Sequence, residues 1–164
     1  MPDRPKIETL MMANHVEAIN NLLYISGGGW TDHWRAIVNG QPVPSLFGVA
    51  VTILVPWSAT NAPHQLAIWF ESGDGQQLNP PIQATFNMGR PAGLSPGADQ
   101  RATLALQLPG MVFAKDGDYC VKARIGPIEA ETPVVNFRVH QLPLPPGAPI
   151  PPPSPMLPQP PTPQ

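Results

Sequence analysis

Two tryptophans, an aspartate and a histidine lie within five residues of one another: Trp30, Asp32, His33 and Trp34. We call this group the tryptophan cluster. Indole rings can stack on a flat ligand and histidine titrates near neutral pH, so the cluster predicts a ligand slot with the rings as walls and the imidazole as a titratable group. The alternative, which we favour, is a folded-back loop whose tryptophans cover one end of the core.

Two arginines form a second candidate binding group. Arg90 and Arg101 bracket a loop from residue 91 to residue 100, where guanidinium groups can bind an acidic group on a partner. Pairing with Asp99, which would shape the loop, is the simpler interpretation. Trp57 joins the tryptophan cluster in the small-molecule hypothesis.

The sequence contains no motif typical of catalysis or metal binding. The four histidines lack zinc-ligand spacing, and the single cysteine, Cys120, has no local partner motif. No serine stands in a Gly-x-Ser-x-Gly context. The run of glycines at 27–29 lacks the Gly-Lys-Ser/Thr end of a phosphate loop, so it indicates a turn with positive φ or a close backbone approach. We therefore expect no catalytic residue, no metal site and no cofactor.

The elements that must position these residues are strands. Apolar side chains recur at every second position, which is the period of a strand with one face toward a core. Residues 46–56 are apolar on both faces, which indicates a central strand. The pattern predicts an all-β fold, a two-sheet antiparallel sandwich of about seven to nine strands, with room for a short helix at 15–20. The main segments are 7–13, 22–26, 46–56, 66–70, 82–88, 104–108, 119–125 and 135–139.

Composition changes after His140. Residues 141–164 hold 12 of the 25 prolines and no charged or aromatic residue, so this segment cannot bury a core. We expect a β-sandwich domain over residues 1–140 and a disordered proline-rich tail over 141–164. The tail is an inert spacer or a docking ligand for PxxP-binding grooves. We favour the spacer, because no basic residue flanks the PxxP spacings.

A short segment resembles a feature of immunoglobulin-like domains. Residues 115–121, Lys-Asp-Gly-Asp-Tyr-Cys-Val, are similar to the tyrosine corner at the start of strand F. The resemblance implies that Val121 occupies the position of the second cysteine of immunoglobulin domains. By the alternation of the strand, Cys120 lies on the opposite face from Tyr119. An immunoglobulin-like sandwich is therefore the expected architecture.

A wider resemblance covers roughly residues 6–140. These residues resemble a family of small bacterial proteins known as a domain of unknown function. The resemblance implies a bacterial single-domain β-protein, and it implies no activity, cofactor or site. The segments that carry it are 23–30, 55–57 with Asn61 and His64, 89–91, 96–97 and 99–101.

Composition also limits the partners and the compartment. Charged residues make up 12% and the net charge is -2, so no basic excess is present to neutralise the phosphates of a nucleic acid. No run approaches the ~20 apolar residues that span a bilayer, so we expect no membrane partner. The single cysteine and the lack of a signal-peptide pattern favour the cytoplasm, with a virion as the open alternative.

Three functional hypotheses follow. The first is a non-enzymatic protein interaction module, because the sequence shows no catalytic arrangement and aromatic residues, here tryptophans expected on loops, are favoured at interface hot spots. The second is a structural component of a phage or another large assembly. The third is a small-molecule binder that uses residues 30–34 with Trp57. We rank them in this order, and the identity of the partner and the oligomeric state stay open.

Overall fold

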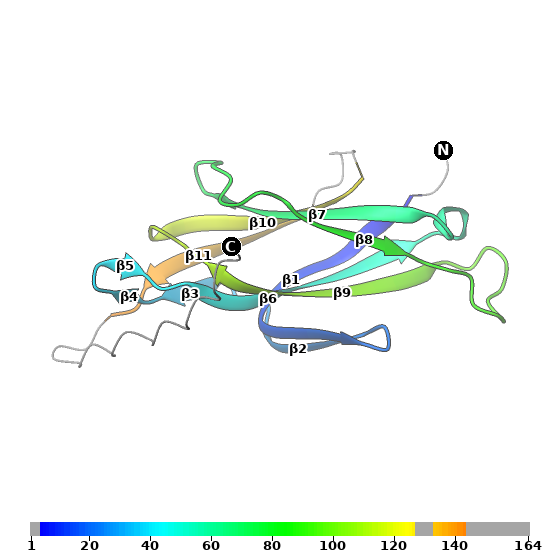
Figure 1. The fold of residues 1–164 in the computed structure, drawn as a ribbon, viewed down its shortest axis with the longest axis horizontal. Coiled ribbons are helices and arrows are strands. Elements are labelled where there is room, and N and C mark those ends of the chain that lie inside the picture. The colour runs from blue at the N-terminus through cyan, green and yellow to red at the C-terminus, as the bar shows by residue number, and fades with distance from the viewer. Residues whose placement is uncertain (1–3, 127–132, 144–164) are drawn as a thin grey trace, which may run out of the picture.

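The computed structural model describes residues 4–126 and 133–143 of the 164-residue chain (Figure 1). The described residues are almost entirely strand and loop, which confirms the predicted all-β class. They hold eleven strands and one short 3-10 helix: β1 (Lys6–Ile19), β2 (Leu22–Gly28), β3 (Asp32–Arg35), β4 (Ile37–Val38), β5 (Gln41–Pro42), β6 (Ser45–Val55), η1 (Trp57–Ala59), β7 (Pro63–Ser72), β8 (Ile82–Asn87), β9 (Gln100–Met111), β10 (Gly117–Ile125) and β11 (Val134–Gln141).

The strand count exceeds seven to nine because β3, β4 and β5 are short and lack an alternating apolar pattern. The helix considered for residues 15–20 is wrong, because β1 continues to Ile19. Residues 144–164 of the predicted tail lie outside the described residues. No helix in the described ranges has the length and apolar character needed to cross a membrane.

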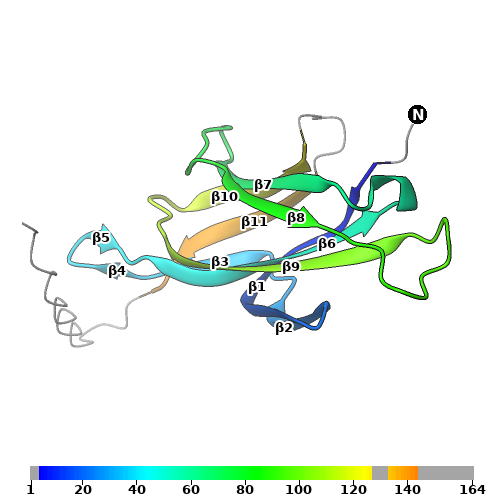
Figure 2. The ribbon, with the colours of Figure 1, turned by 45° about the vertical axis from the view of Figure 1, so that its right-hand side comes forward.

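Most strands belong to two sheets. The four-stranded sheet has the order β2-β1-β6-β9, and the five-stranded sheet has the order β3-β11-β10-β7-β8. Every described pair is antiparallel except β3 with β11. Strand β6 lies between β1 and β9, as its two apolar faces indicated. Figures 1 and 2 show β7, β8 and β10 on one side of the molecule and β2 on the opposite side.

Buried side chains from both sheets form one apolar core. Phe47 of β6, Phe70 of β7 and Phe137 of β11 belong to the same cluster. Phe113 stacks on Phe47 at a centroid distance of 6.0 Å and meets the ring of Tyr119 edge-on at 5.2 Å. Because aromatic rings bury large areas, this group of five supplies much of the attraction between the sheets.

The end of β1 and the whole of β2 form a hairpin that folds over the outer face of the four-stranded sheet. Asn20 and Asn21 have positive φ values of 51° and 59°, which is the type I′ geometry that suits a two-residue hairpin. Gly48 admits Val16 at close range, because a Cβ at Gly48 would lie 2.3 Å from Val16 Cγ2. Val16 therefore packs with Ala13 and Ala50 in a second, smaller apolar cluster.

Candidate functional site

The outward side chains of β3, β11, β10 and β7 share one surface, which we call the polar face. Val121 of β10 and Val139 of β11 point into the core, so the residues on either side of each point away from it. The register then places outward residues of adjacent strands side by side. The main members of the polar face are Asp32, Trp34, Trp69, Glu71, Asp118, Cys120, Lys122, Asn136, Arg138 and His140.

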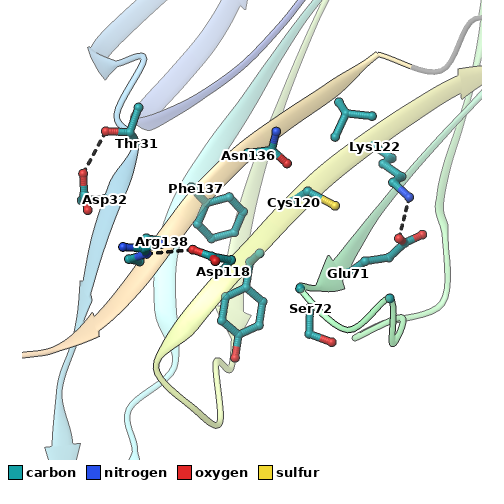
Figure 3. Close-up of a pocket in the computed structure, with 14 residues that line it drawn as sticks. Thr31, Asp32, Glu71, Ser72, Asp118, Cys120, Lys122, Asn136, Phe137 and Arg138 are labelled. Atoms are coloured by element: carbon teal, nitrogen blue, oxygen red, sulfur yellow. Dashed lines mark hydrogen bonds and ion pairs between the residues drawn. The ribbon is translucent and has the colours of Figure 1, made fainter.

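Ion pairs cross the polar face between neighbouring strands (Figure 3). Arg138 Nε donates to Asp118 Oδ1 at 2.7 Å, and Lys122 Nζ donates to Glu71 Oε2 at 2.6 Å. Hydrogen bonding from Arg138 lowers the pKa of Asp118, and hydrogen bonding from Lys122 lowers the pKa of Glu71. Both carboxylates are therefore ionised at neutral pH, and each has a fixed cationic neighbour.

An aromatic and acidic group lies at the β3 edge of the polar face. Asp32 Oδ1 lies 2.7 Å from His140 Nε2, and its Oδ2 accepts a hydrogen bond from Thr31 Oγ1 at 2.8 Å. These hydrogen bonds, first that of His140, lower the pKa of Asp32. The Trp34 indole stacks on the His140 ring at 4.7 Å and is still 52% exposed.

The other half of the tryptophan cluster points the opposite way. His33 stacks on Trp30 at 5.2 Å, and its Nε2 lies 2.8 Å from Ser45 Oγ. Burial lowers the pKa of His33. Trp30 packs against the core and meets Phe137 edge-on at 5.7 Å.

This arrangement corrects the view of residues 30–34 as a loop. Asp32 to Arg35 form β3, and alternate side chains of a strand point to opposite faces. Trp30 covers part of the core, as the capping interpretation expected of both tryptophans, but Trp34 does not. The two indoles therefore do not face one another across Asp32 and His33.

The remaining predicted site residues lie elsewhere. Arg90 Cζ lies 4.1 Å from the centre of the Trp57 ring, and Arg90 Nε donates to Thr60 Oγ1 at 2.6 Å. Arg101 of β9 pairs with Glu8 of β1 at 2.6 Å, across the intervening strand β6. The expected pairing of these arginines with Asp99 is wrong, because Glu8, Trp57 and Thr60 take that role.

The structure does not bring Trp57 to the tryptophan cluster. His33 contacts Ser45, the first residue of β6, whereas Trp57 follows Val55, the last residue of that strand. An eleven-residue strand is roughly 33 Å long. The two groups therefore lie at opposite ends of β6.

A groove crosses part of the polar face. Fourteen described residues line an open groove of about 810 Å³ over β3, β11, β10 and the end of β7. Burial raises the pKa of the Cys120 thiol, so this side chain is protonated at neutral pH and is a poor nucleophile. Within the described ranges, no three His, Cys, Asp or Glu side chains are grouped as metal ligands are. The groove thus presents the fixed charges of the two ion pairs, and the exposed Trp34 indole lies outside its lining.

Sequence reasoning missed most of the polar face. Asp118, Lys122 and Arg138 were not among the candidates, although each alternates with buried apolar residues and so had to point outward. That alternation could have identified them. His140 could not be found in this way, because its contact with Asp32 spans 108 residues and depends on the parallel pairing of β3 with β11.

Together, the strands and this face define an all-β domain with a charged outer sheet surface and a mostly apolar, aromatic-rich core. A family model described as a family of unknown function, DUF6941, matches residues 8–140. The chain belongs to this family, which confirms the resemblance to a domain of unknown function. A comparison with curated proteins found no match to the chain.

Proposed function

We propose that the protein is a non-enzymatic interaction module that binds a protein partner on the polar face, with Trp34 as the main contact. The observation that carries this proposal is the 52% exposure of an indole that is already held against His140. Tryptophan is enriched at interface hot spots, where it fills a recess on the partner. A ring fixed before binding loses little conformational entropy when the complex forms.

The surrounding charges favour a protein surface as the ligand. Asp118 and Arg138 are both exposed, and they lie beside the Trp34–His140 stack on adjacent strands. A partner that carries one acidic and one basic side chain can form ion pairs with Arg138 and Asp118, so that no charge in the interface is left unpaired. Such complementarity determines the orientation and the choice of partner more than it determines affinity.

We also infer that the two sheets form an immunoglobulin-like sandwich. Tyr119 Oη donates to Lys115 O at 2.9 Å, which is the bond that defines a tyrosine corner. If β10 is strand F, then β1, β6 and β9 correspond to strands A, B and E of one sheet. The order β11-β10-β7-β8 then corresponds to G, F, C and C′ of the other. Both correspondences support this architecture.

Quantitative affinity capture tests the proposed function. The full chain, the Trp34→Ala variant and a Leu46→Ala variant serve as baits in extract of the native host. Leu46 is a matched control, because it is another large exposed side chain and lies in the four-stranded sheet. We expect Trp34→Ala to weaken binding of the recovered partner by about tenfold or more, as removal of a hot spot of about 2 kcal/mol does.

Binding of the partner should depend on other residues of the polar face as well as on the Trp34 indole. Arg138→Ala removes the cation next to the stack and should weaken binding of the same partner, more strongly at low salt than at high salt. The proposal is overturned if no partner binds with micromolar affinity or better. It is also overturned if Leu46→Ala weakens binding as much as Trp34→Ala does.

A further inference from the structure

We propose that a second copy of this chain binds at the free edge of β2, so that two β2 strands pair antiparallel about a two-fold axis centred on Tyr24. This inference goes beyond the proposed function, because β2 belongs to the four-stranded sheet and the polar face belongs to the five-stranded one. The two proposals can therefore fail independently.

Strand β2 is an exposed apolar edge. It pairs with β1 and with no other strand in the described part of the chain. Leu22 is 59% exposed, Tyr24 52% and Ile25 39%. An edge strand of this kind presents unpaired backbone groups to any extended segment that fits it.

The register identifies the backbone groups on the free edge. Ile19 and Leu22 flank the two-residue type I′ turn, so they form a hydrogen-bonded pair, and so does every second pair from there. The pair of Glu17 with Tyr24 is therefore hydrogen-bonded, and Leu23 and Ile25 direct their N–H and C=O groups away from β1. An independent bond supports this assignment, because the Val16 N–H points away from β2 and donates to Gln107 Oε1 at 3.3 Å.

These free groups are self-complementary. A two-fold axis at Tyr24 places Leu23 opposite Ile25 of the second copy, and Ile25 opposite Leu23 of the second copy. Each is then a hydrogen-bonded pair, so all four free groups of Leu23 and Ile25 are satisfied in each chain. Tyr24 lies opposite itself in a close, non-hydrogen-bonded pair, where aromatic side chains interact favourably.

The β2 edge combines exposed apolar side chains with a lack of charges and prolines. Its sequence, Leu-Leu-Tyr-Ile-Ser-Gly-Gly, contains no charged residue and no proline. In contrast, the edge strand β9 contains Arg101 and Pro109, and the edge strand β3 is four residues long and contains Asp32 and Arg35. The edge strand β8 also lacks charges and prolines, but its exposed side chains are polar: Gln83, Thr85 and Asn87. Charges, prolines and short length are the usual means of preventing edge pairing. A second copy fits an uncharged β2 without an ionic mismatch.

Sedimentation velocity of the full chain tests the proposal when Tyr24 is replaced by a residue of positive or of negative charge. We expect wild-type protein to form a dimer with rising concentration. Tyr24→Lys and Tyr24→Glu each place like charges opposite one another, so each should raise the dimer dissociation constant by about tenfold or more. An equimolar mixture of the two variants should regain the dimer, because the charges opposite one another are then unlike.

A disulfide tests the register directly. In a Cys120→Ser background, Tyr24→Cys places two thiols in a close pair with Cα atoms about 4.5 Å apart, within the range of a disulfide. Glu17→Cys is the matched control, because Glu17 neighbours Tyr24 on the same face of the hairpin. Across the dimer the two Glu17 positions are three strand spacings, or about 14 Å, apart. Mild oxidation should cross-link the Tyr24→Cys chain and leave the Glu17→Cys chain monomeric.

Three results would overturn the proposal. The first is a wild-type chain that stays monomeric at millimolar concentration. The second is a dimer that persists in Tyr24→Lys and Tyr24→Glu alone. The third is equal cross-linking of the Tyr24→Cys and Glu17→Cys chains. Trp34→Ala serves as a reference throughout and should leave the dimer intact, because Trp34 lies in the other sheet.

Discussion

At the scale of a residue, His33 packs against aromatic side chains, and its surroundings disfavour protonation of its imidazole. Its ring contacts Trp30, Phe47 and Phe113, at centroid distances of 5.2, 6.1 and 5.4 Å. The Ser45 hydroxyl is the polar partner of its Nε2. Because these neighbours are uncharged, burial acts alone and favours the neutral imidazole.

We expect this burial to make stability depend on pH. The folded-state pKa of His33 lies below its ordinary value of 6.5, so the unfolded chain binds a proton that the folded chain resists. The His33 contribution is therefore complete above pH 6.5 and is lost as the pH falls below that value. The slope from one such group is at most about 1.4 kcal/mol per pH unit. Urea denaturation of wild-type and His33→Phe protein between pH 5 and pH 8 measures it.

The comparison of wild-type protein with His33→Phe isolates the contribution of His33 to the pH dependence of the unfolding free energy. His33→Phe keeps an aromatic ring in the site and removes the titrating group, so its unfolding free energy should fall less steeply between pH 6.5 and pH 5. The other three histidines are common to both proteins and contribute equally. Identical pH slopes in the two proteins would show that His33 is not buried as described.

At the scale of an element, Asn21 holds the hairpin against β9. Its Nδ2 donates to Arg101 O at 2.7 Å, and its Oδ1 accepts from the backbone N–H of Thr103 at 3.1 Å. The same Oδ1 also accepts from Thr103 Oγ1 at 3.1 Å. One side chain therefore occupies backbone groups on the outer edge of the four-stranded sheet and fixes the direction of the hairpin.

Asn21→Gly should destabilise the protein while it preserves the turn. Glycine adopts positive φ freely, so the backbone at position 21 keeps its conformation and only the side-chain bonds are lost. We expect a cost of about 1–2 kcal/mol in unfolding free energy, as for two or three hydrogen bonds that water partly replaces. Asn20→Gly is the matched control, because Asn20 shares the left-handed conformation with φ of 51°. Equal effects of the two substitutions in urea denaturation would refute the role of Asn21.

The local course of most strands could be predicted from sequence, and their partners could not. Strands β6 and β10 follow the predicted segments closely, because alternation is a local property of the chain. Strand β3 was missed, since Asp-His-Trp-Arg is short and polar and becomes a strand only by pairing with β11. The hairpin of β4 and β5 was also missed, although the Asn39-Gly40 pair between them is a strong turn signal.

For the molecule as a whole, we expect protection from hydrogen exchange to follow the sheet order. Strands β6 and β10 are each paired on both sides and carry fully buried side chains. Their amides should exchange only through global unfolding, and those of the edge strands β2 and β3 should exchange faster through local opening. Hydrogen–deuterium exchange of dilute protein, followed by mass spectrometry, measures the order in which the strands exchange. Equal protection of β2 and β6 at low concentration would contradict it.

For the candidate site too, local sequence patterns identify individual residues but not the sheet order that brings them together. Trp34 was found because its residue type is chemically distinctive, but its exposure depends on the side of β3 on which it lies. The outward residues of β10 and β11 were readable from alternation, yet their union into one face depends on the order β3-β11-β10-β7. Sheet order arises from the packing of the whole core, and no local pattern encodes it.

The parallel pairing of β3 with β11 has a consequence for synthesis. Asp32 leaves the ribosome long before His140, and 108 residues separate the two in sequence. Until β11 emerges, β3 lacks its neighbour, Trp34 has no imidazole to lie against, and the surface proposed to bind the partner does not exist. Nascent chains arrested before residue 134 should therefore be incompetent for partner recognition, which would prevent premature engagement during translation.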